Sequence, residues 1–304
     1  MHNIKDIRAN LENFVKTISK RNHKVDQSLL LSLDTKNRDL IQKKENLEQE
    51  KKIISKSKDK SLFEKSKKLS NEIDQISSEQ LKIKNDLDNL LSNIPNLPLA
   101  DVPEGSDESY NTEVEKKGKI PEFKFKPKSH SELGSDLSMI DFDLATKTTG
   151  SRFVFLKEKI ALLERALSNF MIDKHTRDNG YTEISPPLIA SESTMYGTGQ
   201  IPKFIDDQFE IKLDDKSERK FLIPTAEVIL TNMVKGKILN KNDLPLRLVA
   251  STPCFRKEAG SYGKDTKGMI RQHQFYKVEL VSIVEPENCK SELERMTNCA
   301  TEIL

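Results

Sequence analysis

Apolar residues at intervals of seven constrain the fold of this chain more than any other feature. Two such runs lie within residues 26–92, separated by a polar stretch at 55–61. Heptad spacing is typical of a coiled coil, so we expect an antiparallel helical hairpin with arms roughly 40–45 Å long at about 1.5 Å per residue. The second heptad position is filled less regularly, and includes Lys44 and Gln80. The main heptad positions are Leu33, Leu40, Leu47 and Ile54, then Leu62, Leu69, Ile76, Ile83 and Leu90.

The composition agrees with a long exposed element beside a second domain. Only 35% of the 304 residues are hydrophobic and 32% are charged, with a net charge of +2. The interval from Lys36 to Lys68 holds twelve Lys and Arg against six Asp and Glu, a local charge of +6. Such a run is either a solvated face of the hairpin or an arm laid along a nucleic-acid backbone. Its charge alone does not decide between the two. Residues 3–20 predict one amphipathic helix that packs against the base of the hairpin.

The cysteines and the apolar runs bound the cellular setting. Cys254, Cys289 and Cys299 form no CxxC pair, which favours a reduced protein without a cysteine zinc site. The N-terminus has no apolar leader, and no run of 18 apolar residues occurs. We therefore expect a soluble, cytoplasmic protein with no membrane partner.

Proline and glycine mark the change from one domain to the next. Residues 94–102 contain two prolines, Pro95 and Pro98, which end the second helix of the hairpin. The polar stretch that follows carries Gly105, Gly118 and Pro121. We predict an arm over 1–110, a linker over 111–127 and a second domain over 128–304.

The second domain opens with alternating helix and strand signals. We expect helices near 139–146 and over 153–177, and strands over 181–189 and 221–223. Thr225 and Glu227 then stand at a helix start. They can serve as a helix cap and a first-turn acid, or project a hydroxyl and a carboxylate into a cleft that takes an ammonium group. His130, before a short helix, is expected to have a structural role.

Residues 248–282 form two β-like runs around a Gly-rich loop at 259–269. Side chains two apart on a strand point the same way, so Arg256 and Glu258 share a face, and Arg271, Phe275 and Glu279 share a face on the return. At about 3.3 Å per residue, Phe275 and Glu279 lie roughly 13 Å apart. Each residue alone is more often a solvated ion pair or a core aromatic. Together they predict a surface that handles nucleotides.

The order FR-x-E, Gly-rich loop and RQHQF-x-KVE resembles motif 2 of class II aminoacyl-tRNA synthetases, in the wording of the seryl-tRNA synthetase family. The helix, strand and Pro186-Pro187 before it resemble motif 1, which builds the dimer interface in that family. The resemblance implies an α+β fold: a helical-hairpin arm, then a class II domain with a mostly antiparallel sheet flanked by helices. It also implies that the arm binds tRNA(Ser).

The implied activity is a ligase that activates L-serine with ATP to seryl-adenylate and transfers serine to tRNA(Ser), and to tRNA(Sec) where that exists. Arginine grips phosphate bidentately and stabilises charge that develops in a dry site, so Arg256 is the candidate catalytic residue. Alternation turns Lys257 and Gln272 to the other face, so they would reach ATP through backbone atoms. By resemblance, ATP is held by Arg256, Lys257, Glu258, Gln272 and Phe275, serine by Thr225, Ala226, Glu227 and Glu279, and Mg²⁺ by Glu279.

This sequence departs from the family at its end. The family continues with motif 3, a Gly-rich strand and helix whose arginine binds ATP, and no such segment occurs here. The helical pattern from Pro286 also reaches Leu304 without a stop signal. We therefore expect a fragment that is inactive alone, with a non-catalytic tRNA-binding paralogue as the alternative. A purely structural coiled coil does not explain the Thr-Ala-Glu and motif 2 wording.

Overall fold

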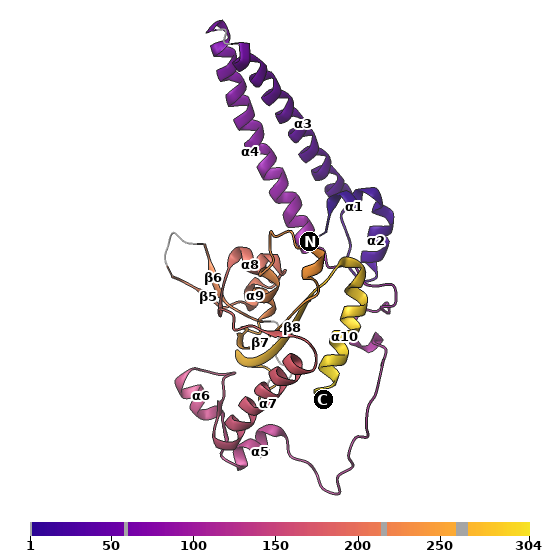
Figure 1. Ribbon diagram of the computed structural model, residues 1–304, viewed down its shortest axis with the longest axis vertical. Helices are drawn as coiled ribbons and strands as arrows, with labels where there is room; N and C mark the ends of the chain where they lie inside the picture. Colours follow the sequence, from indigo (N-terminus) through magenta and orange to yellow (C-terminus); the bar gives the residue numbers. More distant parts are fainter. Residues whose placement is uncertain (1, 58–59, 214–217, 260–266) are drawn as a thin grey trace. The chain divides into compact units, whose positions relative to one another are not determined.

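The computed structural model describes residues 2–57, 60–213, 218–259 and 267–304. The chain divides into two compact units, Met1–Lys119 and Ile120–Leu304. Figure 1 draws the helical first unit in indigo and purple, and the mixed second unit in magenta to yellow.

Two long helices form the predicted hairpin. α3 (Gln27–Ser57) and α4 (Phe63–Asn93) each have 31 residues and lie side by side in opposite directions (Figure 1), with a short 3-10 turn at Lys60–Leu62 between them. Heptad positions 69 and 76 are buried in the seam. The polar position Gln80 is also used, because its Nε2 donates to Asn37 Oδ1 at 2.8 Å. A polar pair inside an apolar seam favours one register of the two helices. Within the described residues no helix has the length and apolarity to cross a bilayer.

The base of the hairpin is built from two helices, where one was predicted. α1 (Ile4–Ala9) ends at Asn10, and α2 (Leu11–Ser19) begins after it. The Asn10 side chain accepts the backbone N–H of Asn13 at 3.3 Å, and such a cap competes with continuing the helix. Packing against the hairpin is as predicted, with a core of Ile7, Phe14, Ile18, Leu30, Leu33, Leu87, Leu91 and Ile94.

The second unit carries six α-helices and eight strands among its described residues. The prediction near 139–146 was partly wrong, because a short strand pair, β1 and β2, brackets α6. This pair also delays the start of α7 to Glu158. The helices are α5 (His130–Asp136), α6 (Phe142–Thr148), α7 (Glu158–Arg177), α8 (Glu192–Gly197), α9 (Glu227–Asn232) and α10 (Cys289–Thr301). The short strands are β1 (Ile140–Asp141), β2 (Phe155–Leu156), β3 (Thr182–Glu183), β4 (Ile189–Ser191), β5 (Glu210–Ile211) and β6 (Lys220–Leu222).

A long antiparallel pair is the centre of this unit. β7 (Leu246–Phe255) pairs with β8 (Gln274–Ile283) over ten residues, and β3 joins β7 in parallel on its other edge. A second, antiparallel sheet has the order β4-β6-β5, and β1 pairs with β2. The mostly antiparallel architecture is the one predicted.

The two faces of the β7–β8 pair are covered differently. One face packs Val249 and Leu280 against Ile172 of α7 and Cys299 of α10. The other face packs against α9 only near one end of the pair. The apolar cluster formed there contains Ala226, Leu230, Leu248, Ala250 and Val281. Further along that second face lie the partner positions Ala250↔Glu279, Thr252↔Lys277 and Cys254↔Phe275, and these build the candidate site.

Candidate functional site

The site begins where α9 stops covering the β7–β8 pair. Phe275, Lys277 and Glu279 alternate along β8 and therefore lie on one face. The segment before α9 runs beside them, because the β8 face contacts α9 and Thr225 reaches both Lys277 and Glu279. A strand and a helix start thus bring polar side chains together above a sheet.

The Thr225 hydroxyl is the centre of a saturated hydrogen-bond cluster. It donates to Glu279 Oε2 at 2.5 Å and accepts from Lys277 Nζ at 2.8 Å and from the Glu227 backbone N–H at 3.2 Å. Lys277 and Glu279 also form an ion pair. A hydroxyl has one donor and two acceptor positions, so this one is fully used. The N-cap of α9 is Ala226 and not Thr225, although Thr225 still accepts the Glu227 N–H in front of the helix. That Thr225 and Glu227 bind a ligand stays a prediction.

Glu227 is exposed at the surface beside this cluster. Surrounding protein desolvates its carboxyl, and the charge of Glu279 adds to that effect, so its pKa is raised; Lys277 and Arg256 act in the opposite direction. Among the residues that the structure describes, no hydrogen bond or ion pair to the Glu227 carboxylate is found. Such a carboxylate gains most from a cationic ligand.

Arg256 connects this cluster to Phe275. Its Nε donates to the Pro224 carbonyl at 3.2 Å, and its guanidinium carbon lies 5.3 Å from the centre of the Phe275 ring. The backbone pairing of the two runs continues past β7, since the Arg256 N–H donates to the His273 carbonyl at 3.0 Å. Arg256 is therefore held at the junction of the sheet and the segment before α9.

The expectation that Arg256 and Glu258 share a strand face was wrong, because β7 ends at Phe255. Glu258 has a left-handed φ of 52°, which a strand does not permit. The backbone there is held from outside the strand: the Lys257 and Ala259 N–H groups donate to the carbonyl and side chain of Asp207 at 2.8 and 2.7 Å.

Arg271 likewise lies before β8 rather than on its face. Its guanidinium nevertheless reaches Glu258, with Nη1 2.9 Å from Oε2. The ion pair therefore joins the outgoing and returning ends of the connection. Gly268, on the returning end, has a φ of +68°, as a Gly-rich turn requires. Gly260 and Gly263 of the predicted loop lie outside the described residues.

Lys257 and Gln272 lie outside β7 and β8, so strand alternation does not decide which way their side chains point. The Lys257 ammonium lies 5.9 Å from the centre of the Phe209 ring, and its backbone N–H is used by Asp207. Gln272 is buried, 6% exposed, and its Nε2 has no partner within the described residues. A buried donor of this kind calls for an explanation, and a ligand is one.

Lys277 is the site residue that the sequence argument missed. Period-two alternation from Phe275 to Glu279 places it on the same face, and that signal was present in the sequence. From sequence alone, a lysine in a strand is expected to point into solvent, because its hydrogen-bond partners are unknown. Thr225, 52 positions away, is one of those partners.

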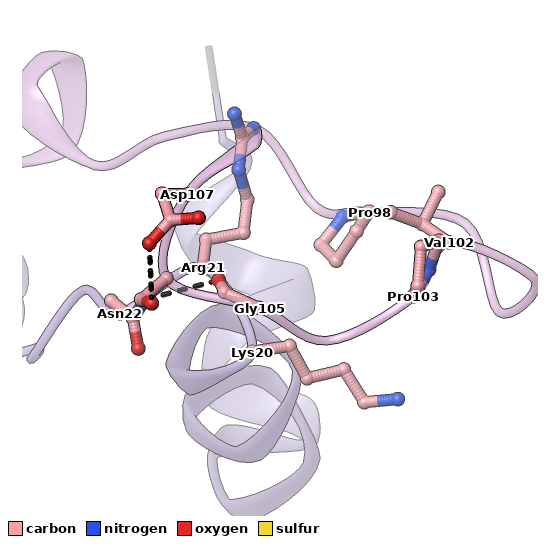
Figure 2. A pocket seen from close by; sticks show the side chains of 9 residues that line it. Lys20, Arg21, Asn22, Pro98, Val102, Pro103, Gly105 and Asp107 are labelled. Atoms are coloured by element: carbon pink, nitrogen blue, oxygen red, sulfur yellow. Dashed lines mark hydrogen bonds between the residues drawn. The ribbon is translucent and has the colours of Figure 1, made fainter. Parts of the chain in front are cut away.

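A separate pocket of about 510 Å³ lies in the first unit (Figure 2). Lys20 and Arg21 line it. Lys20 pairs with Glu104 at 3.0 Å, and Arg21 Nη1 donates to the Asn96 carbonyl at 2.9 Å. Figure 2 also shows the bond from Asn22 Nδ2 to the Gly105 carbonyl, 3.1 Å long. These contacts hold the end of α2 against the chain that follows α4, so we assign the residues that line this pocket a structural role.

Two families match this sequence in separate stretches. Residues 1–98 match the seryl-tRNA synthetase N-terminal domain, and residues 208–304 match the tRNA synthetase class II core domain (G, H, P, S and T). The first match spans the hairpin and its base. The second includes β7, β8 and the residues gathered around Thr225.

Individual relatives resemble the whole chain. It is 69% identical over 304 residues to the serine–tRNA ligase of Pelagibacter ubique, covering all of this chain and 73% of the relative. The Ehrlichia canis serine–tRNA ligase is 45% identical over 312 residues, with 100% and 73% covered.

A solved structure supports the same resemblance. The seryl-tRNA synthetase of Pyrococcus horikoshii complexed with ATP superposes with a TM-score of 0.84 at 32% identity, covering 100% of this chain and 74% of that one. The cytoplasmic serine–tRNA ligase of Naegleria fowleri in complex with AMP gives 0.78 at 26% identity, covering 96% and 68%.

Proposed function

This chain belongs to the seryl-tRNA synthetase family of class II aminoacyl-tRNA synthetases, and from this premise we propose that its site activates L-serine with ATP to seryl-adenylate and transfers serine to tRNA(Ser). The observation that carries the proposal is the gathering of Thr225, Glu227, Glu279 and Arg256 beside Phe275 on one sheet face. These residues complement the three parts of seryl-adenylate in order along the site: Glu227 faces the ammonium group, Arg256 the phosphate and Phe275 the base.

Serine binds at the end of the site nearest α9. The Glu227 carboxylate takes the substrate ammonium group, since desolvation by the surrounding protein and the charge of Glu279 have raised its pKa and a cation relieves both penalties. Glu279 accepts from the serine hydroxyl, Thr225 holds the Glu279 carboxylate in place through its own bonded hydroxyl, and Ala226, fully buried, forms the wall beside them. Lys277 holds Thr225 and Glu279 in place. A pocket that hydrogen-bonds a hydroxyl rejects analogues without one, because its buried polar groups would be left unpaired.

ATP binds at the other end. Arg256, fixed by the Pro224 carbonyl, stabilises the negative charge that develops when the serine carboxylate attacks the α-phosphorus and the bond to the leaving pyrophosphate breaks. The carboxylate is already ionised, so no general base is needed. Phe275 stacks on the adenine, Glu258 accepts from its amino group, and the buried Gln272 amide supplies a donor. Lys257 can contribute its carbonyl or side chain, because its N–H is already bonded.

The residues present fit a Mg²⁺ ion bound together with ATP. The described residues hold no group of three or more His, Cys, Asp or Glu side chains arranged for a metal. Mg²⁺ with nucleotides, however, is usually held by one or two carboxylates and the phosphates themselves. Glu279 would supply one oxygen. The ion would offset phosphate charge during the attack.

The hairpin of α3 and α4 binds tRNA(Ser), and residues 1–110, 111–127 and 128–304 act as arm, linker and catalytic domain. Exposed lysines near the tip, including Lys52, Lys56 and Lys67, contact the RNA backbone, where each phosphate contact adds salt-dependent affinity. Replacing these three with Gln should lower the slope of log K against log salt by about 1 per lysine. Filter binding across a salt series measures it, and an unchanged slope would exclude the arm from the interface.

A second copy of the chain covers the outer face of α7. Leu163, Leu167 and Phe170 follow helical spacing and are 50%, 46% and 51% exposed, whereas Ile172 packs on the sheet. Apolar stripes of this size on a helix mark interfaces. Leu167→Lys should shift the sedimentation of an extended chain from dimer to monomer, with Leu293→Lys, also exposed, as the control. Equal sedimentation of both variants would contradict this interface.

The proposal extends to location and to further substrates. The protein works in the cytoplasm, where tRNA is charged, and tRNA(Sec) is a second acceptor where it exists. Charging assays with both transcripts test this directly. Charging of tRNA(Ser) alone would restrict the acceptor range.

Serine-dependent exchange of pyrophosphate into ATP tests the activity. It should be run on this 304-residue chain and on a chain extended by the C-terminal segment of a relative, because the chain spans 73% of its closely matching relative. We expect exchange in the extended chain. Arg256→Ala should reduce it by about 10²–10³-fold, whereas Arg177→Ala, on an exposed ion pair with Asp173, should not.

Absence of exchange in both chains, with binding of tRNA intact, would overturn the enzymatic proposal. It would leave the non-catalytic tRNA-binding protein as the function. Exchange that survives Arg256→Ala would retain the activity but remove Arg256 from its proposed role.

A further inference from the structure

Residues 129–157, named the collar here, contact both ends of the connection between β7 and β8. The collar comprises α5, β1, α6 and β2, and none of its residues belongs to the proposed substrate contacts. It is itself well fixed: the Ser129 and Glu132 side chains form a capping box on α5, and β1 pairs with β2. Ile140 packs so closely on Gly134 that a Cβ there would lie 2.3 Å from it.

The outgoing end of the connection is bonded to Arg152. Its Nη1 donates to the Glu258 carbonyl at 3.1 Å. Glu258 is the residue with the left-handed φ of 52°, a conformation that costs a non-glycine residue energy and persists only when its surroundings hold it. Arg152 is one of those surroundings.

The returning end is bonded at two points. The Met269 N–H donates to His130 Nε2 at 2.9 Å, and the His273 N–H donates to the Arg152 carbonyl at 3.0 Å. The His273 ring also packs against Phe153, with centres 5.4 Å apart. The collar is thus hydrogen-bonded to the chain at Glu258, where the connection leaves β7, and again at Met269 and His273, where it returns to β8.

We propose that His130 and Arg152 are positioning residues for the nucleotide end of the site. By fixing both ends of the connection, they set where Arg271 and its partner Glu258 stand relative to Phe275. The serine end is anchored separately, on α9 and on the interior of β8. The effect on ATP binding rests on the proposed function, whereas the hydrogen bonds from the collar to the connection do not depend on it.

The bond geometry supplies a matched set of variants. His130 accepts through Nε2, and a glutamine places its oxygen near that position, whereas an asparagine places it near Nδ1. His130→Gln should therefore retain the bond, and His130→Asn and His130→Ala should lose it. Amide hydrogen exchange at Met269 in the 304-residue chain should rise about tenfold in Ala and Asn and stay near the wild-type rate in Gln.

Kinetics in the extended chain test the consequence. His130→Ala should raise the KM for ATP in pyrophosphate exchange about tenfold and leave the KM for serine within about twofold, with His130→Gln restoring the ATP value. Arg152→Ala should act in the same way, and Arg152→Lys should restore part of the loss because it can still donate.

The two measurements separate two failures. Exchange at Met269 that does not change in His130→Ala, or that rises equally in Gln, would overturn the hydrogen bond between His130 and Met269 whatever the activity. A protected Met269 with equal rises in both KM values would overturn the positioning role. A chain without activity would contradict the proposed function, and hydrogen exchange would still decide on the collar.

Discussion

The proposed serine end and the proposed nucleotide end of this site are built in opposite ways. Thr225, Lys277 and Glu279 stand on the interior of a ten-residue strand and beside a buried helix start. Arg256, Glu258 and Arg271 stand beyond the strand ends, held by contacts from distant segments. Regular secondary structure therefore positions Thr225, Lys277 and Glu279. Tertiary contacts position Arg256, Glu258 and Arg271, so we expect substitutions to displace these three residues more easily.

The largest effect should come from the ion pair that anchors α10 to β7, the strand that carries the site. Arg247 on β7 donates two bonds to Glu292 of α10, at 2.8 and 2.9 Å, and Arg295 adds more. Breaking a mostly buried ion pair leaves a charge uncompensated. Glu292→Gln should thus lower the free energy of unfolding by about 2–4 kcal/mol at neutral pH, as measured by urea denaturation.

The same anchor has a defined pH dependence. Arg247 and Arg295 hold the pKa of Glu292 well below its usual range, against the effect of burial. A depressed carboxyl pKa stabilises the fold above its unfolded value and loses that contribution as pH falls toward the folded one. The stability gap between wild type and Glu292→Gln should therefore narrow below about pH 4.5. A gap independent of pH would contradict the assignment.

A smaller change should affect the serine end alone. Lys277→Met removes the ammonium that holds Thr225 and Glu279, so in the extended chain the KM for serine should rise about tenfold while that for ATP changes less than about twofold. Lys241→Met, which breaks the exposed pair with Glu285, is the control. Equal changes in both KM values would mean that the two ends are not independent.

Glu227 should give the serine end its own pH dependence. Desolvation by the surrounding protein and the charge of Glu279 raise its pKa, and only the ionised form attracts an ammonium group. Serine affinity should therefore increase as pH rises through that raised pKa, and Glu227→Gln should remove this part of the profile. Titration of serine binding from pH 4 upward measures it. An identical profile in the variant would exclude Glu227 as the ammonium partner.

The smallest effect should come from Gly268, at the nucleotide end. An added Cβ would meet His130 Nε2 at 2.2 Å, and φ is +68°. Gly236 has a φ of +71° with nothing within 4 Å, so Gly236→Ala reports the backbone cost alone, about 1 kcal/mol. Gly268→Ala should exceed it in thermal unfolding, and His130→Ala should abolish that excess in the double variant. Additive changes would contradict the contact.

Alternation along one strand correctly predicts that Phe275 and Glu279 share a face, because both lie within β8. The same rule that selected Phe275 and Glu279 also covers Lys277, which was overlooked because its partner Thr225 is remote in sequence. Periodicity likewise predicted the helical hairpin. Periodicity does not reveal where a side chain caps a helix, and the cap at Asn10 divides the one predicted helix into two.

The nucleotide end could not be read in the same way. Alternation predicts that the strand continues through Glu258, but β7 ends at Phe255 and Glu258 itself has a left-handed φ. What fixes that residue is Asp207 and Arg152, about 50 and 100 positions earlier. No local pattern in the sequence connects these segments, and His130 appeared only as a structural histidine.

A structure of the extended chain with a non-hydrolysable seryl-adenylate analogue tests the central claim most directly. We expect the base between Phe275 and the Glu258 carboxylate, the phosphate mimic at Arg256, and the serine ammonium at Glu227. The collar should keep its bonds to Met269 and Glu258. A ligand with its base at the Glu227 end, or bound away from the β7–β8 face altogether, would contradict the account.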